Sequence, residues 1–197
     1  MRRRHAGAAT ATAAAALLLV GAAPAASDSW DYAVVHEGPF VIDKDLIYQD
    51  DLIIRNGTLT VYGILEGSVR QEGKGGVYVA KGGELAGTVT ESSSGGIRVS
   101  GTIWGSVQET GTGSVIVHST GRISGDVSEG GSAGNIDIRG RVHGSAVETR
   151  AGHLWVRPKA TVVESVSEEG AGDLYLYKGA SVGGDVTESG PGKLVRR

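Results

Sequence analysis

Aliphatic residues recur at fixed intervals along most of this chain. One row is almost entirely valine and repeats every 18 to 20 residues: Val69, Val89, Val107, Val127, Ala146, Val166 and Val186. A second row lies four residues before the first: Leu65, Leu85, Ile103, Ile123, Val142, Val162 and Val182. Such a fixed period indicates a repeat architecture in which each unit contacts mainly its neighbours.

A third row consists of aliphatic pairs that stand two residues apart and follow a glycine. The pairs are Leu59/Val61, Val77/Val79, Ile97/Val99, Val115/Val117, Ile136/Ile138, Leu154/Val156 and Leu174/Leu176. A spacing of two is the period of a β-strand with one buried face. Glycine and small polar residues separate the runs, as turns require, and the 3.6-residue period of a helix is missing from the repeats.

A single short strand of this kind cannot bury its apolar face, but stacked copies can. We therefore expect an all-β, single-domain parallel β-solenoid with 18–20 residues per coil and about eight coils over residues 46–197. The steps of 18, 19 and 20 residues do not keep the strict six-residue sides that left-handed solenoids usually have. They favour a right-handed β-helix.

The two ends of the chain depart from the repeat. Residues 1–26 combine three arginines, an apolar run from Ala6 to Val20 and a small-residue stretch at 23–26, which is typical of a secretory signal peptide. The run is shorter than the roughly 20 residues that a membrane-spanning helix needs, so we expect no integral span in the mature chain. Residues 27–45 lack the repeat and are expected to cap the solenoid. At the other end the repeat stops, and Arg196 stands where the second aliphatic residue is expected. Either this charge blunts the strand edge or the end stays open, and we predict weak self-association through the C-terminal end.

Charge and cysteine content narrow the function. The formal net charge is −3, and the leader contains three arginines and no acid, so the remaining chain carries about −6. That balance argues against a nucleic-acid partner, which favours a basic surface. The chain has no cysteine, so neither disulfides nor a lipidated cysteine can hold it. We expect a secreted protein, released or associated with the cell envelope.

Two phrases of the repeat carry a family resemblance. Residues 121–127 (GRISGDV) and 179–186 (GASVGGDV) resemble the repeated G-x-Φ-x-G-D-Φ phrase of bactofilins, the polymer-forming β-helix proteins of bacteria, and residues 56–63 (NGTLTVYG) resemble their first coil. The repeats are also similar, more loosely, to the strand-loop-strand repeats of secreted adhesins. Both resemblances imply a structural or adhesive role. Bactofilins, however, are cytoplasmic scaffolds, whereas this chain begins with a leader.

An acidic row follows the valine row by two residues. Its members are Gln71, Glu91, Glu109, Glu129, Glu148, Glu168 and Glu188. Because a stack of buried, unpaired carboxylates is unfavourable, we expect the chain to turn here and the row to face water. The carboxylates are also expected to accept hydrogen bonds from turn N–H groups. The six glutamates are the candidate metal ligands, for Ca²⁺ shared between coils, although the glycine-aspartate loop of calcium-binding repeats is absent.

Aromatic residues mark the outward positions of the predicted walls. Residues between the paired aliphatics face outward and read Thr60, Tyr78, Arg98, Ile116, Asp137, Trp155 and Tyr175. The candidate ligand contacts are Tyr78, Trp104, Trp155, Tyr175 and Tyr177, which offer apolar rings to sugars of a cell-wall glycan.

No catalytic residue or cofactor site stands out among the known motifs. The favoured function is therefore a secreted, non-enzymatic structural or adhesive β-solenoid that self-assembles at the cell envelope. A carbohydrate-binding module is the first alternative. A small β-helix enzyme that acts on polysaccharides is the second, with paired acids drawn from the glutamate row.

Overall fold

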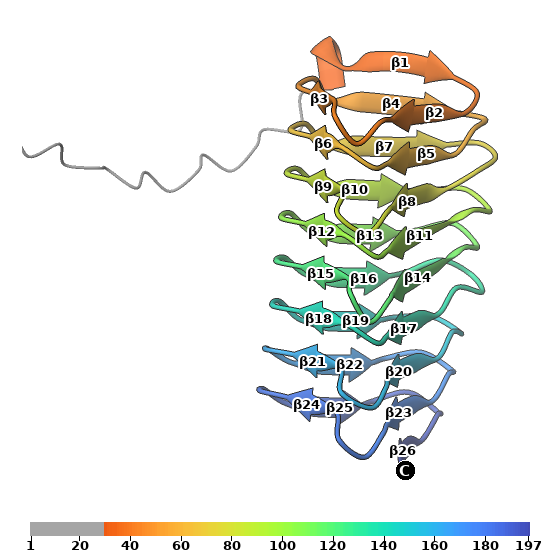
Figure 1. Ribbon diagram of the computed structural model, residues 1–197. Helices are drawn as coiled ribbons and strands as arrows, with labels where there is room; N and C mark the ends of the chain where they lie inside the picture. Colours follow the sequence, from red (N-terminus) through yellow and green to blue (C-terminus); the bar gives the residue numbers. More distant parts are fainter. Residues whose placement is uncertain (1–29) are drawn as a thin grey trace, which may run out of the picture.

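The computed structural model describes residues 30–197 as a stack of parallel coils (Figure 1). Three parallel sheets run the length of the stack, two with nine strands and one with eight. A short 3₁₀ helix, Trp30–Tyr32, precedes the first coil. The predicted all-β parallel solenoid is confirmed, with one more coil than the sequence indicated, because Val34–Ile42 already forms strands. The leader predicted over residues 1–26 lies outside the described residues.

Each coil contributes one strand to each sheet. The first sheet contains β1 (Val34–Glu37), β4 (Leu52–Arg55), β7 (Val69–Glu72), β10 (Val89–Glu91), β13 (Val107–Glu109), β16 (Val127–Glu129), β19 (Ala146–Glu148), β22 (Val166–Glu168) and β25 (Val186–Glu188). The second contains β2 (Phe40–Ile42), β5 (Leu59–Val61), β8 (Val77–Val79), β11 (Gly96–Val99), β14 (Ser114–Val117), β17 (Ile136–Ile138), β20 (Leu154–Val156), β23 (Leu174–Leu176) and β26 (Leu194–Arg196). The third contains β3 (Ile47–Tyr48), β6 (Ile64–Leu65), β9 (Glu84–Leu85), β12 (Thr102–Ile103), β15 (Arg122–Ile123), β18 (Arg141–Val142), β21 (Thr161–Val162) and β24 (Ser181–Val182).

The three aliphatic rows stack as predicted. In the first sheet Val107 pairs with Val89 on one side and Val127 on the other, and the same register continues through the row. In the third sheet Ile103 lies between Leu85 and Ile123. Inside the stack these side chains are fully buried and form one continuous core. Burial of like residues on like residues is therefore what sets the register of every sheet.

Glycines that precede the second-sheet strands stack directly on one another. A Cβ on Gly95 would lie 1.6 Å from the carbonyl oxygen of Gly75, and a Cβ on Gly152 would lie 1.5 Å from that of Gly134. No side chain fits at such a distance, so the backbones of successive coils approach more closely here than any other residue permits. This close approach explains why a glycine leads almost every third-row pair.

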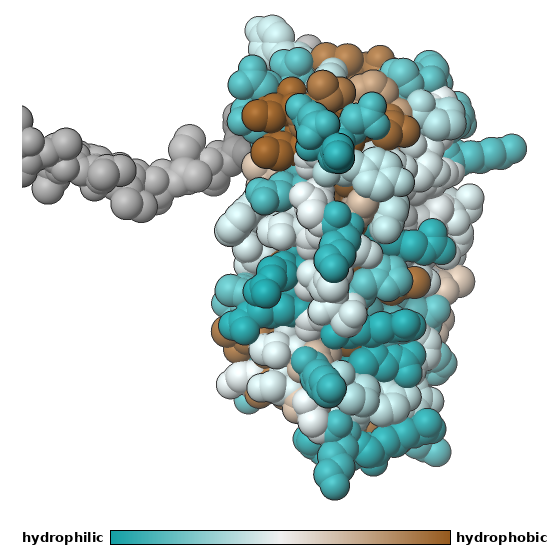
Figure 2. Space-filling model, viewed as in Figure 1, coloured by the Kyte–Doolittle hydropathy of each residue, from teal (hydrophilic) through white to brown (hydrophobic). Residues whose placement is uncertain are grey.

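The two ends of the stack differ in character. Residues 34–42 fall within the segment expected to cap the solenoid, and β1 and β2 extend the first and second sheets by one strand each. Around this first coil Val41, Leu46 and Ile47 are 48–61% exposed, and Figure 2 shows apolar surface gathered at this end. The opposite end is mainly hydrophilic in the same view. Among residues 30–197 no helix has the length and apolar character needed to cross a membrane.

Candidate functional site

The glutamate row lies inside the solenoid, and the prediction that it faces water was wrong. Each of these residues is the third residue of its first-sheet strand, two positions after an inward valine or alanine, so strand alternation continues through it. Glu91, Glu109, Glu129, Glu148 and Glu168 are completely buried, and Glu188 on the last coil is partly buried. The row is therefore not exposed, and the desolvation cost of its carboxyl groups has to be offset by hydrogen bonds or by protonation.

One oxygen of every glutamate accepts a hydrogen bond from the turn that follows it, as predicted. The N–H of Gly131 donates to Glu129 Oε1 over 2.8 Å, and the N–H of Gly111 donates to Glu109 Oε1 over 2.7 Å. The same contact from the residue two positions later recurs in all six coils. Each glutamate therefore closes its own turn from the inside, as a capping acid does.

The second oxygen, Oε2, is buried in all six glutamates, with no hydrogen-bond donor from backbone, hydroxyl or amide groups. The groups next to it along the stack are the carboxyl groups of adjacent coils: Glu109 is the ladder partner of Glu91 on one side and of Glu129 on the other. Burial, and then hydrogen bonding to Glu148, raises the pKa of Glu129 to about 9. Burial likewise raises the pKa of Glu109 and of Glu188 to about 7. The raised pKa values of Glu109, Glu129 and Glu188 favour their protonated forms, because ionisation would place buried like charges next to one another.

Gln71 shows which kind of side chain the buried row accommodates. It occupies the row one coil before Glu91 and is equally buried, but its side chain is permanently neutral. Its Nε2 donates to the carbonyl oxygens of Gly57 and Lys74, and its Oε1 accepts from Ser93 Oγ over 2.9 Å. A neutral side chain with a hydrogen to donate is therefore fully accommodated, which agrees with protonated rather than ionised glutamates in the row.

Cation binding by the row stays a prediction. Within residues 30–197 no group of three or more histidine, cysteine, aspartate or glutamate side chains is arranged to hold a metal ion. The glutamate oxygens are also enclosed, whereas Ca²⁺ takes six to eight oxygen ligands. Thermal unfolding measured in millimolar Ca²⁺ tests the prediction, and an unchanged midpoint would remove it.

The outward residues of the second sheet have the predicted register. Arg98 pairs with Tyr78 and Ile116, and Trp155 pairs with Asp137 and Tyr175. The five aromatic residues predicted to contact a ligand do not form one surface. Trp104 directly follows β12 of the third sheet, and its Nε1 donates to Glu84 Oε2 over 3.5 Å.

Tyr78 is four ladder steps from Trp155, about 19 Å at the usual strand spacing. Only Trp155, Tyr175 and Tyr177 lie close together. The rings of Trp155 and Tyr175 are nearly parallel, at 22°, with centroids 6.0 Å apart. The guanidinium of Arg157 lies 5.1 Å from the ring centroids of both Trp155 and Tyr177, and that of Arg197 lies 5.1 Å from Tyr175. Aromatic and cationic groups therefore alternate over the last coils of this face.

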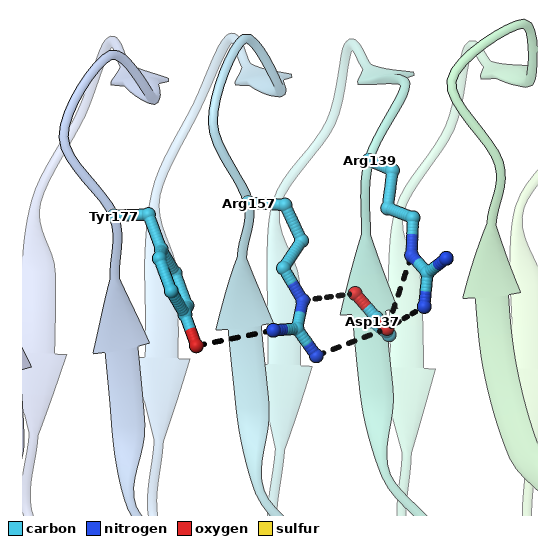
Figure 3. Close-up of polar contacts among 4 residues, drawn as sticks. All are labelled: Asp137, Arg139, Arg157 and Tyr177. Carbon is cyan, nitrogen blue, oxygen red and sulfur yellow. Dashed lines mark hydrogen bonds and ion pairs between the residues drawn. The ribbon is translucent and has the colours of Figure 1, made fainter. Parts of the chain in front are cut away.

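An acid-centred cluster joins this aromatic group, and sequence reasoning missed it. Asp137 Oδ1 accepts from Arg157 Nε over 2.8 Å, and Asp137 Oδ2 accepts from Arg139 Nη2 over 2.7 Å (Figure 3). Arg157 Nη1 also donates to the hydroxyl of Tyr177. Burial would raise the pKa of Asp137, but hydrogen bonds from Arg157 and Arg139 hold it below its usual value. The sequence signal for this cluster is weak. Asp137 and Trp155 occupy the same outward position of successive coils, and each is followed two residues later by an arginine.

A hollow of about 520 Å³ opens beside this cluster. It is lined by Ser119, Arg139, Arg157, Pro158 and Lys159, with no acidic residue among them. Asp137 lies beneath the arginines, with 10% of its side chain exposed. The lining is thus cationic, although the chain as a whole is acidic.

No family model matches this chain, and no similar curated protein or solved structure was found. The repeat architecture is shared with β-helix proteins in general. The specific likeness to bactofilins rests on the quoted phrases.

Proposed function

We propose that this chain is an exported, non-enzymatic structural protein that forms an adhesive surface at the cell envelope and assembles end to end. The observation that carries the proposal is the unbroken parallel register of the three sheets, which end in unpaired strands at both ends of the described chain. A second copy stacked head to tail continues the same ladders in the same direction. Bactofilins, whose phrases the repeats resemble, polymerise.

The position of the glutamates supports a non-enzymatic role. Paired acids that cleave glycosidic bonds must reach the substrate from opposite sides of the bond. The acids of this row are instead enclosed behind the first sheet, and each Oε1 is engaged with its own turn. Incubation with a panel of acidic polysaccharides tests this point, and release of unsaturated products would contradict it.

Self-association through the C-terminal end is tested by changing the last coil. Leu194 pairs with Leu174 and is 37% exposed at the end of the stack. In sedimentation velocity over a range of concentrations, we expect Leu194→Lys to lower the fraction of dimers and longer assemblies, because it places a charge on the surface that a second copy would cover.

Gln108→Lys is the matched control, since Gln108 is exposed on the first sheet in the middle of the stack. It makes the same change of charge far from either end. Monomer alone at every concentration of the unaltered chain would overturn end-to-end assembly.

A carbohydrate-binding role is the second candidate, because Trp155, Tyr175 and Tyr177 gather at one place on the outer face of the second sheet. It is compatible with the first, since an adhesive solenoid needs a ligand on the envelope. Sedimentation with purified cell walls, compared with a bovine serum albumin control, tests both.

A further inference from the structure

The outer face of the second sheet near its C-terminal end combines rings and cations along the axis of the stack. Trp155 and Tyr175 are neighbours in the ladder, and Arg157 and Tyr177 form a second, parallel column two residues further along their strands. The polar contacts in Figure 3 run from strand to strand in the same direction. Positions in each column therefore repeat at the strand spacing of about 4.8 Å, comparable to the length of one sugar residue in an extended polysaccharide.

The arginines of this face are held in place by Asp137, and they retain N–H groups that make no hydrogen bond within the described residues. Asp137 fixes Arg157 through two nitrogens and Arg139 through two, while Arg139 Nη1 makes no hydrogen bond within the described chain. The Arg139 side chain is 49% exposed. One aspartate between two arginines leaves a net positive charge at the mouth of the hollow. Guanidinium groups pre-positioned in this way bind carboxylate groups with defined geometry.

Lys159 stands where the fold favours glycine. It occupies the third position of the turn Arg157–Ala160, which is closed by the N–H of Ala160 donating to the carbonyl of Arg157, and its φ is 68°. The corresponding position one coil later is Gly179 with a φ of 84°, and an earlier coil has Gly82 with a φ of 86°. A lysine with positive φ costs free energy relative to glycine. Its charge at the rim of the hollow accounts for its presence better than folding does.

We propose that this face is a binding site for an acidic polysaccharide, with sugar rings against Trp155 and Tyr175 and sugar carboxylates at Arg139, Arg157 and Lys159. The proposal rests on the adhesive role proposed above, because it names the ligand of the adhesive surface. Aromatic rings contact the apolar C–H faces of sugars, and the cationic hollow selects polymers that carry carboxylates over neutral ones. A flexible polyanion can lie along the columns Trp155/Tyr175 and Arg157/Tyr177, so the site does not require a closed pocket.

Lys159→Gly is the most direct variant, because glycine suits the backbone at this turn. We expect it to keep or raise the thermal unfolding midpoint and to weaken binding of an oligogalacturonate about five- to tenfold in isothermal titration calorimetry at low salt. Lys81→Ala is the control, since Lys81 is exposed at the same corner of an earlier coil and lies outside the hollow. It should leave the affinity unchanged.

Trp155→Ala tests the aromatic part of the site. We expect a loss of about tenfold or more in affinity for the same oligogalacturonate. Tyr78→Ala removes a ring from the same face four ladder steps away and should have no effect. Because Trp155 contacts its neighbours, the unfolding midpoints of both variants are measured alongside.

Three results would overturn the proposal: no binding of oligogalacturonate, equal binding of a neutral oligosaccharide of the same length, or tighter binding of single-stranded oligothymidylate. Affinity that is unchanged in both Lys159→Gly and Trp155→Ala would also overturn it. None of these results would affect end-to-end assembly. If the chain still sediments with cell walls while oligogalacturonate fails to bind, the adhesive role stands and only the ligand assignment falls.

Discussion

Glu129 and Asp137 are both buried carboxyl groups, one inside the solenoid and the other on the outer face of its second sheet. Counted over the whole residue, Glu129 is 0% exposed and Asp137 is 7% exposed, so burial alone does not explain their different pKa values. The charges of the neighbouring side chains explain the difference. Glu129 has other carboxyl groups above and below it, and its pKa rises to about 9. Asp137 has Arg139 and Arg157, and its pKa falls below the usual value in spite of burial.

The difference shows how one fold accommodates acids in two ways. Inside the stack, each coil from Glu91 to Glu188 repeats a glutamate at the same phase, so Glu129 has a glutamate as its ladder partner on both sides. Neutrality must then come from protons. On the outer face the residues vary from coil to coil, so an aspartate can acquire arginines as neighbours. Periodicity thus places like acids next to one another, whereas a break in periodicity allows the ion pairs of Asp137 with Arg139 and Arg157.

The largest expected effect is on the pH dependence of stability. A group whose folded-state pKa is raised contributes stability that is complete below its unfolded value, about 4.3, and is lost as the pH rises through the folded value. For Glu109, Glu129 and Glu188 this loss extends to pH values of about 7 to 9. Between pH 5 and 7 each retained proton contributes a slope of about 1.4 kcal/mol per pH unit.

Urea unfolding at a series of pH values measures this slope. We expect maximal stability near pH 5, because the lowered pKa of Asp137 makes its contribution disappear in acid while the glutamate row loses stability in base. A free energy of unfolding that is constant or rises from pH 5 to 9 would contradict the raised pKa values of Glu109, Glu129 and Glu188.

Asp137→Asn removes the acid from the outer cluster. Arg139 and Arg157 then face each other without a counter-charge, and we expect a loss of roughly 2–3 kcal/mol in the free energy of unfolding at pH 7, below the value for a fully buried pair because both arginines are partly exposed. Chemical denaturation measures it. Asp185→Asn, at an exposed aspartate, serves as control and should change little.

Glu129→Gln converts one coil of the inner row to the arrangement seen at Gln71. The amide is neutral at every pH and can donate to a neighbouring carboxyl group, so we expect a gain of about 2 kcal/mol at pH 8, roughly 4–8 °C in the unfolding midpoint. At pH 5 the gain should shrink. Glu169→Gln, at an exposed position beside the row, should show neither change.

A destabilised Glu129→Gln variant at pH 8 would mean that the row is ionised and held by cations instead. Added Ca²⁺ would then raise the midpoint of the unaltered chain. Scanning calorimetry at the two pH values, with and without Ca²⁺, separates these outcomes.

Much of the architecture was predictable because the repeat is visible in the residues themselves. The valine row, the aliphatic pairs and the outward wall from Thr60 to Tyr175 all have the predicted register. The first coil was missed although Gly38 precedes the pair Phe40/Ile42 as in later coils, because His36 stands at the phase that the coils from Gln71 onward fill with glutamine or glutamate. The interior position of Glu109 and Glu129 was missed because the cost of burial was assigned to ionised groups, whereas neighbouring acids in a stack can exchange protons.

The amino-acid sequence by itself determined the solenoid, its period and the inward direction of the aliphatic rows, because burial of like residues every coil admits one register. Only the tertiary structure decided what each side chain meets in the next coil. It brought Asp137, Arg157 and Tyr177 together across positions 20 residues apart, and it placed Lys159 at the rim of their hollow. Contacts between coils depend on the exact offset of each turn, which ladder pairing determines and local sequence does not.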